Sequence, residues 1–284
     1  MIADWQTNKV YFSGILRQRF PDVYRRITDA LNSFGYTPEE IPHTRDIWAR
    51  DYMPIQVSEN KFIEYRYDPD YLQGGPDDKQ TRELKTYPDL VCDSMGLKTI
   101  KTDIILDGGN VVKSENNIIL TDKVIWENRR NYSKNALMKQ LHEIFEVEQV
   151  VLIPWDDECI YGHADGMLRF INPDTVIIGG YYDTADDDFR KQILNSLDKA
   201  KLNRDWLRVS ENEAEENIAY INFLQTKDFI LVPAIDRPED DVAVEQISKY
   251  FPDDASQNRI GKISMKDITR YDGALNCISW TIRA

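Results

Sequence analysis

The chain alternates short runs of β-branched and aromatic residues with longer stretches in which apolar residues recur every three or four positions. Runs of the first kind are typical of strands, and the second pattern is typical of amphipathic helices. The pattern predicts strands over Lys9–Leu16, Ile55–Ser58, Lys61–Tyr67, Val111–Lys113, Ile118–Ile125, Gln149–Ile153, Met167–Ile171, Thr175–Gly179, Phe229–Val232 and Leu275–Ile282. It predicts helices over Phe20–Phe34, Thr81–Met95 with a break or kink at Pro88, Ser133–Phe145, Asp187–Ala200 and Asp241–Phe251. Asp68–Asp78, with two prolines and two glycines, is predicted to be a loop.

One plan recurs through these elements: a polar residue, a strand, a tight turn, a strand, a helix and a strand. The leading polar residues stand 55 to 59 residues apart, and they are Asp51, Asp107, His163, Asn222 and Cys277. One supersecondary unit per period indicates a repeat architecture. The last unit lacks a second strand and a helix, which the N-terminal strand and helix can supply, so that five units close into a ring. The sequence therefore predicts an α/β fold like a propeller, a single domain over residues 1–284, with the five polar residues converging near its axis.

The stretch Gly162–Phe170 holds one of three histidines in the chain, and Asp165 follows His163 by two residues. Residues two apart in an extended strand point to the same face. The pattern therefore predicts a proton-transfer group beside a fixed carboxylate.

The residue types at the predicted centre indicate the kind of substrate. A cysteine with a histidine can act as nucleophile and proton shuttle. Nearby aspartates would oppose the oxyanion of an acyl-transfer reaction, whereas carboxylates bind the planar fork of a guanidinium well. We therefore interpret the centre as a guanidinium site in which Cys277 attacks the guanidinium carbon. Because the same carboxylates disfavour a thiolate in the empty site, we expect the arriving cation to help deprotonate Cys277.

Composition and charge limit the class of ligand, the cellular location and the metal sites that the sequence allows. The net charge of −14 disfavours nucleic-acid binding and favours a cationic small molecule. No apolar run approaches the roughly 20 residues of a membrane span, and the N-terminus lacks the pattern of a signal peptide. Three widely spaced cysteines form neither a disulfide framework nor a zinc pair, so we expect a cytoplasmic protein. The acidic runs Asp156–Glu158 and Asp186–Asp188 lack the alternation of a calcium loop, and no metal site is predicted.

Several motifs, in order along nearly the whole chain, resemble those of agmatine deiminases and the related bacterial, Porphyromonas-type peptidyl-arginine deiminases. Trp48–Pro54 resembles W-x-R-D-x-G-P, with Met53 in place of the glycine. Leu106–Asn110 resembles the E-G-G segment, with aspartate in place of glutamate, and Gly162–Phe170 matches G-H-x-D-x-x-x-R-F. Ile221–Phe223 matches a later N-F segment, and the terminal cysteine is preceded by asparagine instead of the usual histidine. The resemblance implies the pentein fold, five ββαβ units around a pseudo-fivefold axis.

The same resemblance implies roles for individual residues and requires neither a metal nor an organic cofactor. Cys277 would attack the guanidinium carbon, and His163 would protonate departing ammonia and then activate water. Asp51 and Asp165 would grip the guanidinium nitrogens. The predicted substrate-binding set consists of Trp48 along the aliphatic chain, Asp107, Asp46 and Asn222.

The resemblance favours a deiminase that acts on agmatine, with free or peptidyl arginine as further candidates. Amidinotransfer, in which an amine resolves the same intermediate, and a guanidine-binding protein without turnover stay open. The loop Asp68–Asp78 is expected to help select the substrate's tail. The sequence also leaves the oligomeric state open, with a homodimer as one alternative.

Overall fold

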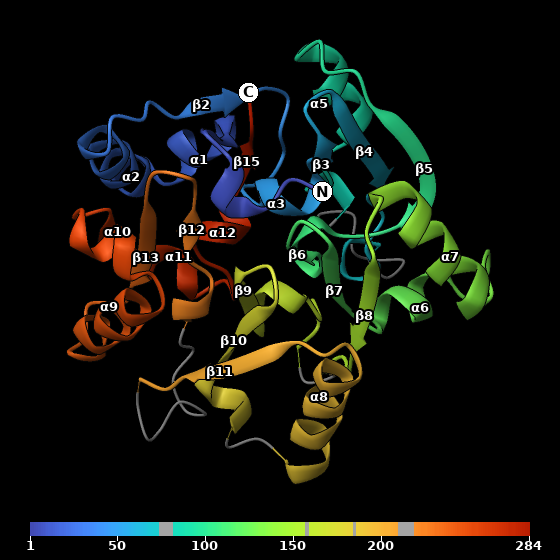
Figure 1. Cartoon of the computed structure of the whole chain (residues 1–284). Helices are drawn as coiled ribbons and strands as arrows, with labels where there is room; N and C mark the ends of the chain where they lie inside the picture. Colours follow the sequence, from blue (N-terminus) through green and yellow to red (C-terminus); the bar gives the residue numbers. More distant parts are fainter. Residues whose placement is uncertain (74–81, 157–158, 184–185, 210–218) are drawn as a thin grey trace.

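The strands in the described part of the chain form five three-stranded sheets that lie around a common centre (Figure 1). The structure is a computed structural model that describes residues 1–73, 82–156, 159–183, 186–209 and 219–284. The sheets contain, each in spatial order, β3 (Ile55–Ser58), β4 (Lys61–Arg66) and β5 (Ile100–Ile105); β6 (Val112–Lys113), β7 (Asn117–Thr121) and β8 (Gln149–Ile153); β9 (Leu168–Asn172), β10 (Thr175–Gly179) and β11 (Asn203–Leu207); β12 (Leu224–Gln225), β13 (Ile230–Ala234) and β14 (Ile260–Ser264); and β15 (Ser279–Ile282), β1 (Lys9–Ser13) and β2 (Glu39–Ile41).

All five sheets are built in the same way. The first strand pairs antiparallel with the middle strand, and the third strand pairs parallel with the middle strand. A parallel neighbour requires a crossover, which a helical segment supplies in each unit. The helices placed within the described residues are α1 (Gly14–Arg19), α2 (Pro21–Ser33), α3 (Ala49–Tyr52), α5 (Pro88–Ser94), α6 (Lys123–Asn128), α7 (Lys134–Phe145), α8 (Asp187–Lys199), α9 (Glu239–Tyr250), α10 (Pro252–Ser256), α11 (Lys266–Thr269) and α12 (Leu275–Ile278). The predicted ββαβ repeat is confirmed.

The longer helices lie on the outside of the ring and pack one apolar stripe against the sheets (Figure 1). In α2 this stripe consists of Val23, Ile27 and Leu31, and in α7 of Leu137, Leu141 and Phe145. A spacing of four residues places such side chains on one helical face. None of the helices in the described residues is both long and apolar enough to cross a membrane.

The two ends of the chain meet in one sheet, as the repeat predicted. β1 pairs antiparallel with β15, with Tyr11 opposite Trp280. The C-terminal strand thus opens the fifth unit, and the N-terminal segment supplies its second strand, its helix and, as β2, its third strand. Ring closure therefore depends on residues from both ends of the sequence.

Three strand predictions were too long, because helical turns begin where strands were expected. The strand predicted over Lys9–Leu16 ends at Ser13, whose Oγ accepts a hydrogen bond from the backbone N–H of Ile15 and caps α1. The strand predicted over Ile118–Ile125 ends at Thr121, before α6, and the strand predicted over Leu275–Ile282 begins only at Ser279, after α12. Each of the three helical turns contains β-branched residues, such as Ile15, Val124 and Ile278, which are also common in strands, so composition alone was misleading.

The helix predicted over Thr81–Met95 is interrupted close to the predicted break at Pro88: Arg82 and Glu83 are helical, whereas residues 84–87 are not. α5 begins at Pro88, where the missing N–H of proline is tolerated because the first helical position needs no intrahelical donor. Thr81 lies outside the described residues. The third strands β5, β11 and β14 and the short β2 were not given residue ranges in advance, since their mixed polar composition gives no clear alternation.

Candidate active site

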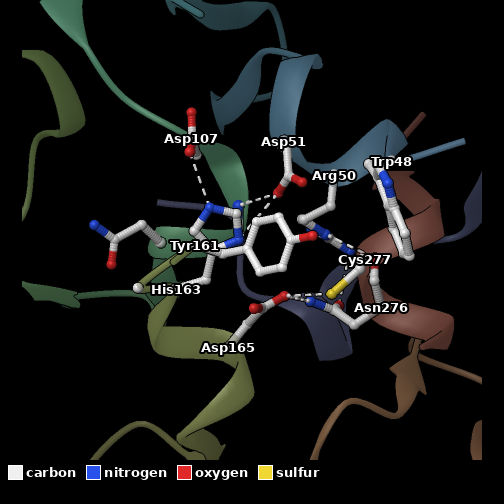
Figure 2. A network of polar contacts seen from close by, with 12 residues as sticks. Trp48, Arg50, Asp51, Asp107, Tyr161, His163, Asp165, Asn276 and Cys277 are labelled. Atoms are coloured by element: carbon white, nitrogen blue, oxygen red, sulfur yellow. Dashed lines mark hydrogen bonds and ion pairs between the residues drawn. The ribbon is translucent and has the colours of Figure 1, made fainter. Parts of the chain in front are cut away.

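Five short helical turns, one before the first strand of each sheet, carry the predicted residues. They are α3 and α12 together with the 3-10 turns η3 (Gly108–Asn110), η4 (Ala164–Gly166) and η7 (Ala219–Ile221). Asp51 lies in α3 and Cys277 in α12, while Asp107, His163 and Asn222 directly flank the 3-10 turns. The turns pack on one another near the centre of the ring, and Figure 2 shows most of these side chains together.

The prediction that His163 and Asp165 share one face of a strand is wrong. β9 begins only at Leu168, and Asp165 lies within the η4 turn that follows His163. Because a 3-10 turn rotates the chain by about a third of a turn per residue, the two side chains diverge. His163 points toward Asp51 and Asp107, whereas Asp165 points toward Cys277 (Figure 2).

The imidazole of His163 lies between two carboxylates. Its Nε2 is 2.9 Å from Oδ2 of Asp107, and its Nδ1 is 3.6 Å from Oδ1 of Asp51. The backbone N–H of Gly109 donates to the same Asp51 oxygen at 3.1 Å. Burial by itself lowers the pKa of His163, but the Asp51 charge and the Asp107 hydrogen bond outweigh it and raise that pKa well above its usual range. The imidazolium form of the ring is therefore favoured, and it can give up a proton.

Cys277 is held by the asparagine and aspartate of the neighbouring turns. Its backbone N–H donates to Oδ1 of Asn222 at 3.1 Å, and its thiol lies 3.6 Å from Oδ2 of Asp165. The same Asp165 oxygen accepts a hydrogen bond from the Asn276 amide at 2.6 Å. Burial, followed by the charges of Asp165 and Asp51, raises the pKa of Cys277 well above its usual range. The thiol is therefore protonated in the ligand-free site.

Arg50 and Tyr71 complete the arrangement, and neither was predicted as a site residue. The Arg50 guanidinium donates to the backbone oxygen of Asn276 at 3.3 Å and to its Oδ1 at 3.0 Å, which fixes the residue before Cys277. Tyr71, in η2 (Asp70–Leu72), donates its hydroxyl to Oδ2 of Asp107 at 3.0 Å. Arg50 stands within the recognised W-x-R-D motif and could have been found there, whereas the loop around Tyr71 carries no such signal.

His163, Cys277 and Tyr71 line a cavity of about 720 Å³. Seven of the eight predicted residues contribute to its wall, and the eighth, Asp107, contacts the imidazole of His163; the seven are Asp46, Trp48, Asp51, His163, Asp165, Asn222 and Cys277. The wall also contains Asp156, Asp272 and several tyrosines, and none of the described residues that line it is Lys or Arg. Of the predicted loop Asp68–Asp78, Tyr71 and Leu72 line the cavity and residues 74–78 lie outside the described part of the chain.

Asp46 contributes a further buried carboxyl group to this cavity. Its Oδ1 accepts a hydrogen bond from the backbone N–H of Trp48 at 2.9 Å. Burial raises the pKa of Asp46 to about 7, against the opposing effect of that hydrogen bond. The cavity thus combines a nucleophile, a proton donor and several carboxyl groups that a planar cation could satisfy. That combination suits chemistry on an amidine or guanidine carbon.

Comparisons with known proteins agree with this interpretation. The sequence matches the family model for Porphyromonas-type peptidyl-arginine deiminases over residues 24–282. It is 24% identical over 224 residues to a Mycoplasma capricolum protein provisionally named an agmatine deiminase, an alignment that covers 66% of this chain and 60% of that protein. The chain therefore spans about 60% of the length of the first curated relatives that it matches.

Solved structures extend the likeness to the whole fold. An agmatine deiminase of C. jejuni matches with a TM-score of 0.77 and 16% identity, covering 100% of this chain and 95% of that one. The dimethylarginine dimethylaminohydrolase of Pseudomonas aeruginosa matches with a TM-score of 0.56 and 11% identity, covering 97% and 99%. At such identities the likeness concerns the fold alone, and it confirms the predicted pentein.

Proposed function

The chain belongs to the Porphyromonas-type peptidyl-arginine deiminase family, a family of guanidino-group hydrolases, and from that membership we propose that it hydrolyses the guanidinium group of a small cationic substrate through a covalent intermediate on Cys277. One observation carries the proposal: a thiol, an imidazolium and several carboxyl groups line a cavity whose described lining has no Lys or Arg. A guanidinium placed there meets acceptors for its N–H donors and a nucleophile for its carbon.

In the proposed reaction, Asp51 and Asp165 accept N–H groups of the guanidinium from its two sides. In Figure 2 these carboxylates lie above and below the space between His163 and Cys277. The Cys277 Sγ forms a bond to the guanidinium carbon, and one C–N bond breaks. His163 protonates the departing nitrogen, while the thiol proton restores the imidazolium, so that ammonia and a cationic amidino-thioether result.

Water then resolves the thioether. His163 gives its proton to the released ammonia, which leaves as ammonium, and the neutral imidazole then takes a proton from water. The water oxygen attacks the same carbon, and the C–S bond breaks while the proton of the added hydroxyl passes to sulfur and gives back the Cys277 thiol. The products are a urea derivative and ammonium, so that atoms and charge balance. Asp107, which holds Nε2 of His163 at 2.9 Å, keeps the other ring nitrogen, Nδ1, turned toward the reacting centre.

The acidic residues of the cavity wall favour agmatine over free arginine. Asp156 and Asp272 are part of this wall, and they suit the ammonium tail of agmatine better than a carboxylate. Trp48 also lines the cavity. Gly273 lets this indole approach, because a Cβ at that position would lie 2.3 Å from Trp48.

The test is ammonia release from agmatine, arginine, a blocked arginine peptide and methylated arginine. We expect turnover of agmatine that falls by roughly a thousandfold or more in Cys277→Ala, since a covalent nucleophile is removed. Cys92→Ala is the matched control, because Cys92 is also buried but lies in α5 and does not line the cavity, and it should keep wild-type turnover.

Other outcomes separate the remaining alternatives. Turnover that survives in Cys277→Ala would contradict the covalent mechanism. Thermal stabilisation by agmatine without ammonia release would favour a binding protein. Ammonia-free transfer of the amidino group to an added amine would favour amidinotransfer.

A further inference from the structure

Lys123, at the start of α6, is a fully buried cation behind the wall of the cavity, with a side chain only 1% exposed. All three of its N–H donors have acceptors: the backbone oxygens of Ile160 and Tyr161 at 3.1 and 2.9 Å, and Oδ1 of Asp70 at 3.0 Å. Glu127, one helical turn further, lies 3.7 Å from the ammonium. Burying a lysine is costly unless it is paired in this way.

The acceptors of Lys123 come from two segments that are far apart in sequence and together form one side of the cavity. Tyr71 and Leu72 belong to the first segment, and Ile160, Tyr161 and Gly162 to the second. The Lys123 ammonium also lies 4.9 Å from the centre of the Tyr71 ring, close enough for a cation–π contact. Lys123 thus binds both segments to the same helix, α6.

Both segments contact the groups that surround His163. The Tyr71 hydroxyl donates to Oδ2 of Asp107, the oxygen that also binds Nε2 of His163. The Tyr161 ring packs against Tyr71 and His163, with centroid distances of 5.0 and 6.1 Å, and Figure 2 shows it beside the imidazole. A shift of either segment would therefore move a neighbour of the proton-transfer group.

We propose that Lys123 is a positioning residue for this reaction: it holds Asp70–Leu72 and Ile160–Gly162 in the register that fixes Asp107, Tyr161 and, through them, His163. Its effect on catalysis rests on the function proposed above, whereas its effect on the two segments does not. Lys123 lines no part of the cavity, so it acts through the residues that do.

The test compares Lys123→Met with Lys113→Met. Lys113, in β6, is also buried, and it donates to Asp4 Oδ1 and to the backbone oxygen of Ile2, both at 2.7 Å, without contacting the cavity wall. Both variants lose a buried ammonium and should lose thermal stability. At a temperature where both are folded, we expect kcat/KM to fall about tenfold or more in Lys123→Met, as small misplacements of catalytic groups do, and to stay within about twofold of wild type in Lys113→Met.

Hydrogen exchange provides a readout that does not depend on activity. In Lys123→Met, peptides covering Asp68–Gln73 and Cys159–His163 should lose protection together, while Lys113→Met should loosen the N-terminal segment instead. Asp70→Asn, which keeps an acceptor but removes the charge, should lower kcat/KM in the wild-type background and have no further effect in Lys123→Met. Such non-additivity is expected when two residues act through one contact.

Wild-type kcat/KM and unchanged protection in Lys123→Met, with the same loss of thermal stability as the control, would overturn the proposal and leave Lys123 a structural residue. If the wild-type protein releases no ammonia from any guanidine, the proposed function fails instead. The positioning role of Lys123 is then tested by hydrogen exchange and by the affinity for guanidinium ions, each compared between the two lysine variants. Unchanged protection and affinity would overturn that role, and a loss confined to Lys123→Met would support it.

Discussion

At the scale of single residues, Cys277 is surrounded by groups that oppose its ionisation. Its thiol is buried and faces Asp165, and burial together with the charges of Asp165 and Asp51 raises its pKa well above the usual range. A planar cation bound between these carboxylates would offset both charges. The thiolate is then stabilised when the substrate is present, which protects an empty site from oxidation and alkylation.

This arrangement predicts a thiol pKa that depends on ligand. An unreactive amidinium ion should lower the pKa of Cys277, because it supplies the opposite charge that the site lacks. Asp165→Asn should lower it without ligand, since one like charge is gone. The thiolate absorbance measured against pH, with the Cys277→Ala signal subtracted, reports this group alone. A thiol pKa that the ligand leaves unchanged would refute substrate-assisted deprotonation.

At the scale of elements, the short turns before each first strand set the geometry, and their small residues allow close approach. Gly109 in η3 is the tightest case beside the imidazole: a Cβ there would lie 2.6 Å from Oδ1 of Asp51 and 2.7 Å from Nδ1 of His163. Both distances are shorter than van der Waals contact. One of the two side chains must therefore move if Gly109 is replaced.

Gly109→Ala is accordingly expected to lower kcat by about a hundredfold while the protein stays folded, because it separates the Asp51 and His163 side chains. Gly179→Ala, at the end of β10, is the control, since its Cβ would meet nothing closer than 3.6 Å. Steady-state kinetics and circular dichroism measure the two effects. Equal activity of both variants would show that the contact at Gly109 has no bearing on catalysis.

The repeated units could be predicted from the sequence, whereas the short turns and the contacts between units could not. The interval between Asp51, Asp107, His163, Asn222 and Cys277 predicted the five units and the meeting of these residues, because repeated hydrophobic patterns encode repeated units. The turns themselves were missed, since buried helical turns and strands have similar composition. Contacts across units, such as the hydrogen bonds from Arg50 to Asn276 or from Tyr71 to Asp107, depend on how the units pack and have no local signature.

At the scale of the whole molecule, one side chain connects the active site to the strands that close the ring. Trp280 of β15, three residues after Cys277, donates its indole N–H to the backbone oxygen of Pro54 at 2.8 Å, and Pro54 follows α3, which carries Asp51. Its ring also packs against Tyr11 of β1, with centroids 5.0 Å apart. This one side chain therefore joins the C-terminal strand, the N-terminal strand and the first unit.

Trp280→Phe should weaken this connection between the strands while it keeps the apolar packing of the aromatic ring. The substitution leaves the Pro54 oxygen without its donor, which costs about 1–3 kcal/mol when the group is buried. The midpoints of thermal unfolding and of thermal inactivation should fall together, because opening of the ring separates Asp51 from Cys277. Trp126→Phe is the control, since the Trp126 side chain is 41% exposed on α6 and its loss should leave both midpoints near wild type. An inactivation midpoint that falls alone would mean that the C-terminal strand detaches locally while the remaining units stay folded.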